Sequence, residues 1–271
     1  MDLFQAIILG IVQGATEFIP VSSSGHLVLV PWLLNWEKPD LIFDTMAHWG
    51  TLVAVVAYYW KDLLKIESSM QQDLARRTPF ASPDSKLGWL LILATIPTVI
   101  IGLLFEDFFE SLFGQPTTVI GFLFVTGLIL WISETLGKRI RKLESLTPRD
   151  AVLFGLAQSM AITPGISRSG STISLGLLLG FTRPAAARFS FLMMIPIVFG
   201  AGLLKVLELL KTGVSGDAFL LLAAGFLSAG ISGYICITFL LNFIATRSVR
   251  SFAIYCWLFG TFCLAVAYMR A

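Results

Sequence analysis

The sequence has little charge, few histidines and few cysteines, and these shortages exclude several classes of protein. Asp, Glu, Lys and Arg make up only 13% of the 271 residues, about half the share that soluble globular domains carry. The net charge of +2 leaves no basic surface for nucleic acid. Three cysteines, all within apolar segments, indicate packing rather than a disulfide framework, and no basic region typical of a cleavable signal precedes the first apolar segment. In contrast, 56% of the residues are hydrophobic, so the sequence predicts an all-α integral membrane protein.

Six stretches are long and apolar enough to cross a bilayer, which requires about 20 residues. These are residues 41–60, 88–105, 117–135, 189–210, 218–243 and 252–269. Two further apolar regions, 3–36 and 151–181, are interrupted by Pro, Gly and Ser, which leaves most of their helical pieces too short to cross. Each is predicted to be a re-entrant hairpin, which enters and leaves the membrane on the same side. Irregular backbone at that depth requires surrounding protein or trapped water.

The distribution of Lys and Arg predicts how these segments are oriented. The connection 106–116 is acidic and has no Lys or Arg. Basic residues concentrate in four other connections: 61–87, 137–150, 182–188 and 246–251. By the positive-inside rule the four basic connections are cytoplasmic and the acidic one lies outside. The chain then forms a single membrane domain with an inverted-topology repeat, in which residues 1–145 and 146–271 each supply one hairpin and three spans. The opposite orientation of the two repeats depends on both hairpins being re-entrant.

A short polar signature occurs twice, once in each interrupted region, at a constant shift of 145 residues. The matched pairs are Gly10 and Gly155, Gln13 and Gln158, Ser22 and Ser167, Ser24 and Ser169, and Gly25 and Gly170. The copies differ in their ionisable residues, which are Glu17 and His26 in the first and Arg168 in the second. A duplicated polar turn within apolar helices predicts one site assembled from two half-sites at membrane depth.

The first copy carries candidate catalytic residues. Gln13 and Glu17 are four residues apart, so they share one helix face. A glutamate inside the membrane is usually functional, although it can also be a hydrogen-bonded anchor. Among the serines that follow, one or two can merely cap the next helix. His26 is predicted to lie in the first turn of that helix, within reach of the Ser23 hydroxyl. A hydroxyl, an imidazole and a carboxylate together are typical of covalent or acid–base catalysis.

The second copy is typical of an anion site. Its turn is rich in glycine and hydroxyl residues and opens a helix, so it offers N–H groups and a positive helix end to an anion. Arg168 adds a planar guanidinium suited to two phosphate oxygens; the alternative is a buried ion pair with Glu17, which would preorganise an empty site. The candidate phosphate-binding residues are Ser22, Gly165, Ser167, Arg168, Ser169, Gly170 and Thr172. The two half-sites together predict phosphoryl transfer within a membrane.

The other ionisable residues are interpreted as structural. His48 is expected to be a polar contact between helices rather than a ligand. Glu134 is expected to be a solvated or helix-end charge. The run Lys138–Lys142, with Arg183 and Arg188, is expected to anchor the cytoplasmic face to anionic lipid.

These motifs closely resemble the bacterial undecaprenyl-pyrophosphate phosphatase family, also called the bacitracin-resistance family, over essentially the whole chain. The resemblance is carried by Gln13-x-x-x-Glu17, Pro20-Val-Ser-Ser23-Ser-Gly-His26, Pro164-Gly-Ile-Ser167-Arg168-Ser169-Gly-Ser-Thr172 and Ala187-Arg-Phe-Ser-Phe-Leu. It implies an enzyme of the bacterial plasma membrane that removes the terminal phosphate from a C55 polyprenyl pyrophosphate, with its site facing outward. This reaction recycles the carrier lipid for peptidoglycan synthesis, and bacitracin competes for the same lipid.

The resemblance also implies residue roles. Ser23 matches the proposed nucleophile and His26 the proposed acid–base group, although the histidine has also been favoured as the attacking group. Glu17 and Gln13 match an acidic motif that implies Mg²⁺ or Ca²⁺. Because Gln13 leaves a single carboxylate there, any ion must rely more on the phosphates of the substrate.

Two other functions remain open from the sequence. An inverted-repeat transporter or flippase for a polyprenyl phosphate lipid would also have broken helices at the membrane midplane. A lipid phosphatase of the acid-phosphatase type shares Ser-Gly-His, but the downstream Arg-x5-His-x3-Asp element is missing from the sequence. Whether the protein forms a homodimer is also left open.

Overall fold

The computed structural model describes residues 1–112, 115–212 and 216–270, and its regular elements are helices. Six of these helices are long and apolar enough to cross a membrane. They are α3 (Leu41–Tyr58), α5 (Pro83–Leu104), α7 (Pro116–Leu136), α10 (Arg183–Thr212), α11 (Gly216–Thr246) and α12 (Arg250–Arg270). The prediction of an all-α membrane protein with six spans is confirmed, and it makes this a multi-pass membrane protein.

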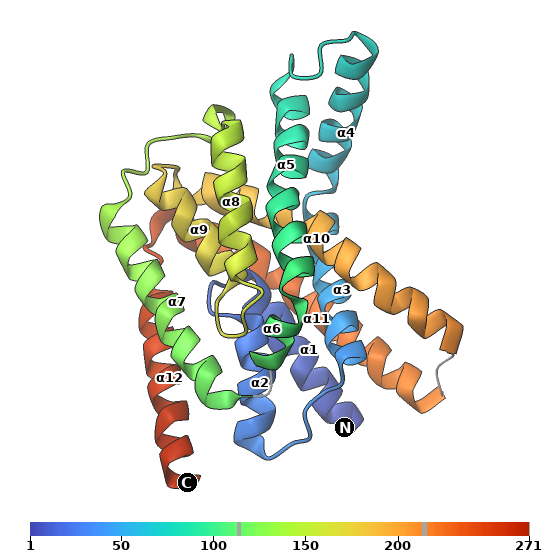
Figure 1. Ribbon diagram of the computed structural model, residues 1–271, viewed down its shortest axis with the longest axis vertical. Coiled ribbons are helices and arrows are strands. Elements are labelled where there is room, and N and C mark those ends of the chain that lie inside the picture. Colours follow the sequence, from blue (N-terminus) through green and yellow to red (C-terminus); the bar gives the residue numbers. More distant parts are fainter. Residues whose placement is uncertain (113–114, 213–215, 271) are drawn as a thin grey trace.

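The two interrupted regions each form a pair of short helices. The first pair is α1 (Leu3–Phe18) and α2 (Ser23–Leu34), and the second is α8 (Pro148–Met160) and α9 (Arg168–Leu178). Figure 1 shows the second pair in the upper part of the molecule and the first pair in the lower part, with their connecting turns directed toward the middle. At a rise of about 1.5 Å per residue, helices of 16 residues or fewer fall short of a hydrocarbon core about 30 Å thick. The re-entrant course and the opposed orientation of the two repeats stay predictions.

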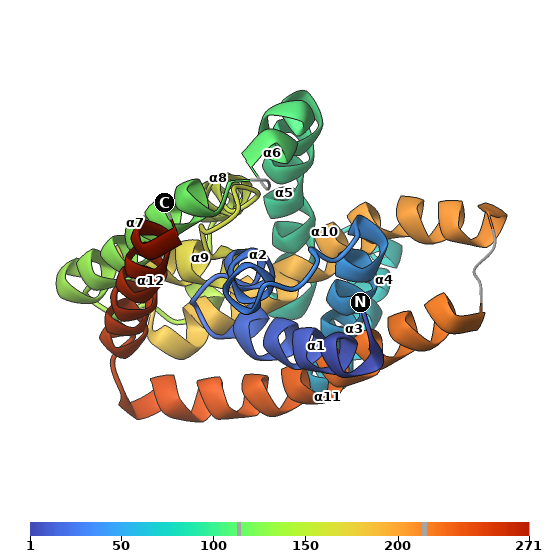
Figure 2. The ribbon, with the colours of Figure 1, turned by 90° about the horizontal axis from the view of Figure 1, so that it is seen from below.

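Helix packing follows the internal repeat. Helix α1 packs against α11, and its equivalent α8 packs against α5; each hairpin packs its own two helices together. Helix α3 contacts its equivalent α10, and α7 contacts its equivalent α12. Seen from below, α2 lies near the centre of the molecule, with α1 and α11 along one edge and α7 and α12 at one side (Figure 2). Val21, Ser22 and His26, in and after the turn that opens α2, are buried, as irregular backbone at membrane depth requires.

Small residues let α1 lie directly on α11. A Cβ atom added at Gly10 or Gly14 would collide with the side chains of Ser228 or Ser232 and with the α11 backbone. Close approach through small residues is a common way of packing membrane helices, because lipid tails leave no hydrophobic drive between them. This contact fixes the helix that carries Glu17.

The remaining elements lie at the ends of the spans. Helix α4 (Trp60–Ala75) extends beyond α3 beside the first turns of α5, and α6 (Glu106–Leu112) and a short 3-10 helix, Leu143–Ser145, lie in connections. The connections α4–α5 and α7–α8, both basic in sequence, lie in the upper half of Figure 1, whereas the α2–α3 connection and both chain ends lie lower. These two basic connections therefore lie at one end of the molecule, and the side of the membrane that this end faces stays a prediction.

One sequence interpretation at the basic end is wrong. Glu134 is neither solvated nor a simple helix-end charge, because it is buried and forms ion pairs with Arg139 and Arg183. It also accepts the backbone N–H of Val249 at 3.4 Å. Arg188 pairs with Asp62 at 2.9 Å. Arg183 and Arg188 therefore join helices to one another, and Glu134 ties the end of α7 to the starts of α10 and α12.

Candidate active site

The turns that open α2 and α9 have the same hydrogen bonds. Ser22 caps α2 by accepting the N–H of Gly25 at 3.2 Å, and Ser167 caps α9 by accepting the N–H of Gly170 at 3.0 Å. In each turn the capping hydroxyl also lies 3.2–3.3 Å from the hydroxyl of the serine two residues later. The capping alternative is confirmed for Ser22, and Ser167 makes the same cap in the second copy. Their hydroxyls, like that of the buried Ser169, hold the turns together and do not line the cavity described below.

The two turns touch each other, as the duplicated signature predicts. A Cβ atom at Gly25 would lie 3.3 Å from the Cα of Gly165, and the Ser169 hydroxyl donates to the carbonyl of Ile19 at 3.4 Å. Gly165 has a φ of 96°, which glycine adopts without strain. Thr126 of α7 holds this turn, because its hydroxyl donates to the Gly165 carbonyl at 2.9 Å and accepts the N–H of Ser167 at 3.0 Å. Gly165 and Gly170 thus shape the turn and permit close approach.

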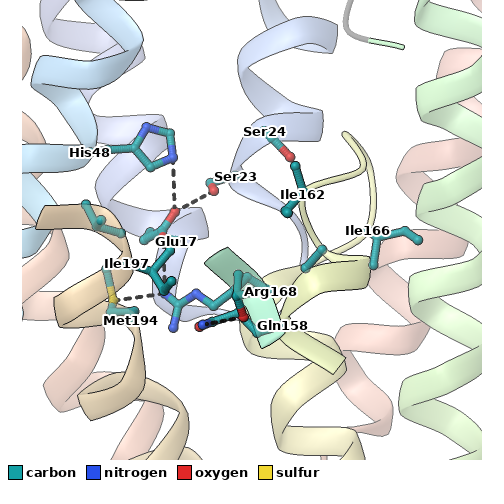
Figure 3. A pocket seen from close by; sticks show the side chains of 13 residues that line it. Glu17, Ser23, Ser24, His48, Gln158, Ile162, Ile166, Arg168, Met194 and Ile197 are labelled. Atoms are coloured by element: carbon teal, nitrogen blue, oxygen red, sulfur yellow. Dashed lines mark hydrogen bonds and ion pairs between the residues drawn. The ribbon is translucent and has the colours of Figure 1, made fainter. Parts of the chain in front are cut away.

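Glu17 is the centre of the polar contacts between the two half-sites (Figure 3). One carboxylate oxygen accepts from the Arg168 guanidinium at 2.8 Å, across 151 residues of sequence. The other accepts from the Ser23 hydroxyl at 2.6 Å and from the Gln13 amide at 3.0 Å. The side chain of Glu17 is 6% exposed and that of Arg168 15% exposed. The buried ion pair offered as an alternative by the sequence is therefore present, and it holds Ser23 and Arg168 at one carboxylate.

Arg168 is fixed from the side of α10 as well. Its guanidinium donates to the carbonyl of Ser190 and to the sulfur of Met194, both at 2.9 Å. Thr172, one turn further along α9, is fully buried, and its hydroxyl donates to the Arg168 carbonyl at 2.8 Å and lies 2.6 Å from the Ser190 hydroxyl. Thr172 thus joins α9 to α10 below Arg168 rather than presenting its hydroxyl to a ligand.

The ring nitrogens of His26 have partners other than the Ser23 hydroxyl, contrary to the expectation from the sequence. Its Nδ1 lies 2.7 Å from the Ser22 carbonyl and its Nε2 lies 2.8 Å from the Tyr255 hydroxyl of α12. The ring is 4% exposed and stacks on Phe259 with ring centroids 4.7 Å apart. Because a carbonyl only accepts, Nδ1 carries the proton, and in the neutral ring Nε2 accepts from the tyrosine. Both ring nitrogens are thus used in fixing the α2 turn to α12.

His48 of α3 makes a polar contact between helices, as expected from the sequence, but its partner is Glu17 of α1, which brings His48 into the site, a place not predicted for it. Its Nε2 lies 3.7 Å from the Glu17 carboxylate, and its Nδ1 lies 2.7 Å from the carbonyl of Asp44. The carbonyl assigns the proton of the neutral ring to Nδ1, which leaves Nε2 free to take a proton beside Glu17. A signal was available in the sequence, since Asp44 and His48 are ionisable residues one turn apart on a spanning helix.

A cavity of about 160 Å³ lies against this cluster. Its polar lining residues are Glu17, Ser23, Ser24, His48, Thr98, Gln158 and Arg168. Gln158 was not among the predicted site residues, although it is the repeat equivalent of Gln13. Its Nε2 donates to Thr98 at 3.2 Å, while its Oε1 is buried without a hydrogen-bond partner. The rest of the lining is largely apolar and includes Ile162, Met194 and Ile197.

The donors near Glu17 do not fit a divalent cation held by the protein itself. Both carboxylate oxygens already accept hydrogen bonds, and Arg168 balances the charge. Gln13 turns its Nε2 toward Glu17, and its Oε1 is buried without a partner. In the part of the chain that the structure describes, no group of three or more His, Cys, Asp or Glu side chains is placed to hold a metal ion.

Comparison with known proteins identifies the family of this chain. The family model described as bacitracin resistance protein BacA matches residues 6–262. An undecaprenyl-diphosphatase of Thermomicrobium roseum is 45% identical over 262 residues, which cover 94% of each chain. Another, from Rubrobacter xylanophilus, is 45% identical over 257 residues with the same coverage, and one from Moorella thermoacetica is 42% identical over the full length of both chains. The chain belongs to the BacA bacitracin-resistance protein family.

Proposed function

We propose that this protein is an undecaprenyl-diphosphatase, which hydrolyses undecaprenyl diphosphate to undecaprenyl phosphate and inorganic phosphate. The observation that carries the proposal is the joint bonding of Ser23 and Arg168 to one buried carboxylate, Glu17. An alcohol, a base in contact with it and a guanidinium for the phosphate are the groups that phosphoryl transfer to a side chain requires. The names of the full-length relatives support the same activity.

In the first step the Ser23 oxygen attacks the terminal phosphorus and its proton passes to the Glu17 carboxylate, 2.6 Å away. The bond from the terminal phosphorus to the bridging oxygen breaks, and undecaprenyl phosphate leaves with that proton. In the second step water attacks the phosphoserine, gives its proton through Glu17 to the serine oxygen, and releases inorganic phosphate. Arg168 and the positive end of α9 stabilise the charge on the transferred phosphoryl group in both steps.

His48 exchanges protons with Glu17 during this cycle. Its Nε2 lies 3.7 Å from the carboxylate, while the Asp44 carbonyl holds Nδ1 in its protonated form. An imidazole held in one tautomer beside a carboxylate is suited to proton transfer. Because His48 lines the cavity with 31% of its side chain exposed, it also connects the buried carboxylate with water in the cavity.

A divalent cation, Mg²⁺ or Ca²⁺, would bind together with the diphosphate rather than be held at Glu17 in the absence of substrate. The donor set around Glu17 and Gln13 argues against a resident ion, and magnesium is often held mainly by substrate phosphates. The cavity would open toward the outer face of the bacterial plasma membrane, where bacitracin competes for the same lipid diphosphate.

Phosphate release from purified protein in detergent tests the proposed function. In detergent there are no separate compartments between which a lipid could be moved, so a transporter or flippase would release no phosphate. We expect release of one phosphate per undecaprenyl diphosphate at a constant rate until the lipid is exhausted. Undecaprenyl monophosphate is the matched control and should release nothing. A protein that binds the diphosphate without releasing phosphate would exclude the enzyme and favour the transporter.

His26 acts as a positioning residue, and a substitution can separate this role from acid–base catalysis. Asparagine places an amide N–H close to the position of Nδ1, so His26→Asn should keep the bond to the Ser22 carbonyl. That carbonyl belongs to a residue with a φ of 71°, a conformation rare for serine. We expect kcat within about tenfold of the unmodified protein and an unchanged pH profile, because a lost neutral hydrogen bond has a net value of roughly 1 kcal/mol.

Tyr255→Phe, which removes the other bond of the ring, is the companion variant and should behave similarly. The pH dependence of kcat is the deciding measurement. A loss of about 10³-fold in His26→Asn, together with the disappearance of one limb of the pH profile, would assign acid–base catalysis to His26 instead.

A further inference from the structure

A second cavity, of about 270 Å³, lies between α5 and α10. Its lining residues are Ile92, Thr95, Ile96, Val99, Ile100 and Pro196. The hydroxyl of Thr95 donates to the Leu91 carbonyl of its own helix at 2.9 Å. The surface that the cavity offers is therefore hydrocarbon.

The α5 side of this cavity faces outward from the protein. Ile92, Ile96, Val99 and Ile100 are 44–50% exposed, and their spacing places them on one face of the helix. In a spanning helix of this hydropathy, an exposed apolar face lies against lipid. The cavity, named here the α5–α10 groove, is therefore open to the hydrocarbon of the membrane.

The α5–α10 groove and the cavity that holds the catalytic cluster are lined by neighbouring residues of the same two helices. The catalytic cavity is lined on these two helices by Thr98, Ile197 and Val198. Val99 and Pro196, the next residues along each helix, line the groove. Each helix has a proline at this level, Pro97 in α5 and Pro196 in α10, and proline bends a helix because it lacks an N–H and crowds the preceding turn.

We propose that the α5–α10 groove binds the first isoprene units of the polyprenyl chain, so that the lipid enters the site sideways between α5 and α10. This inference rests on the proposed function. A polyprenyl diphosphate has a strongly charged head and a hydrocarbon tail, and the head must reach Arg168 and Ser23 while the tail stays in an apolar medium. The groove is an apolar space that faces lipid, and its residues on α5 and α10 are next in sequence to residues that line the catalytic cavity.

The substitution Ile96→Trp tests the groove by filling it with a larger apolar side chain. We expect KM for undecaprenyl diphosphate to rise at least tenfold. For isopentenyl diphosphate, a C5 diphosphate too short to depend on the whole groove, we expect kcat/KM within about twofold of the unmodified protein. Leu103→Trp, on the same helix but outside both cavities, is the matched control because Leu103 is 71% exposed, and it should leave both substrates unaffected.

The outcomes separate the groove from the proposed function. An equal loss of kcat/KM for both substrates, or equal effects of Ile96→Trp and Leu103→Trp, would overturn the tail-binding role. The groove would then be a surface that contacts ordinary membrane lipid. If the unmodified protein hydrolysed neither undecaprenyl diphosphate nor isopentenyl diphosphate, the proposed function would be overturned instead.

A direct measurement covers the case in which Ile96→Trp does not fold. A polyprenyl diphosphate with a photoreactive group in its first isoprene units should label α5 and α10 of the unmodified protein. Labelling confined to other helices would overturn the inference.

Discussion

Ser23→Ala is expected to reduce kcat by about 10³-fold or more while the protein remains folded in detergent. Removal of a nucleophile leaves only binding and electrostatic stabilisation to accelerate the reaction, and losses of this size or larger follow. The fold should survive, because α2 is capped by Ser22 and not by Ser23. Steady-state phosphate release gives kcat, and trapping of a phosphoserine in the unmodified protein by rapid quenching identifies the intermediate.

The neighbouring hydroxyl supplies the control for this prediction. Ser24 also lines the cavity, but its side chain lies beside Ser22 and not beside Glu17. Ser24→Ala should lose no more than about tenfold in kcat, the effect of one weak hydrogen bond near the site. Full turnover by Ser23→Ala would remove the serine from the nucleophile role and leave a water molecule activated by Glu17 as the attacking group.

Arg168→Ala should lose at least as much activity as Ser23→Ala, and it should also destabilise the protein. The substitution removes the charge that binds the phosphoryl group, and it leaves Glu17 as a buried carboxylate without its cationic partner. Breaking a buried ion pair by removing one partner costs roughly 3–5 kcal/mol. Thermal unfolding in detergent should therefore show a clear decrease in the midpoint temperature, alongside a decrease of about 10³-fold in kcat/KM.

Two further variants distinguish binding of phosphate from support of Glu17. The double substitution Glu17→Gln with Arg168→Gln removes both charges, so it should recover much of the thermal stability but none of the activity. Arg168→Lys keeps the charge but loses the planar pair of donors, and it should recover most of the stability with kcat/KM still reduced about tenfold or more. Arg168→Lys with unchanged kcat/KM would show that the planar guanidinium has no specific role.

The architecture was predictable where it depends on local sequence. Apolar length and the positions of Pro and Gly identify six spans and two broken segments without any knowledge of tertiary contacts. Helix ends were less predictable: α10 begins at Arg183, six residues before the predicted apolar span, because hydropathy detects the lipid-facing core of a helix and not its polar first turns. The meeting of the two turns also followed from sequence, since the equivalent Ser and Gly residues form equivalent caps.

Side-chain directions within the site were not predictable in the same way. His26 is close to Ser23 in sequence, but its ring is oriented by Tyr255, 229 residues away. His48 lies on a different helix and reaches Glu17 only because α3 and α1 pack together. Arg183, one of the ion-pair partners of Glu134, likewise comes from another helix. Spacing along one helix identifies which residues share a face, but the identity of the neighbouring helix decides what that face contacts.

The repeat has one more consequence for the catalytic cluster. At the shift that relates the two halves, Ser23 is the equivalent of Arg168, and each is the first residue of its helix. The same shift pairs Glu17 with Ile162, and both line the cavity. A duplicated ancestor with identical halves would have offered two serines or two arginines to that space, and neither set could both attack and bind a phosphate. If Ser23 attacks and Arg168 binds the phosphoryl group, as proposed, divergence at this equivalent position separates the two roles between the halves and would determine which way the substrate lies.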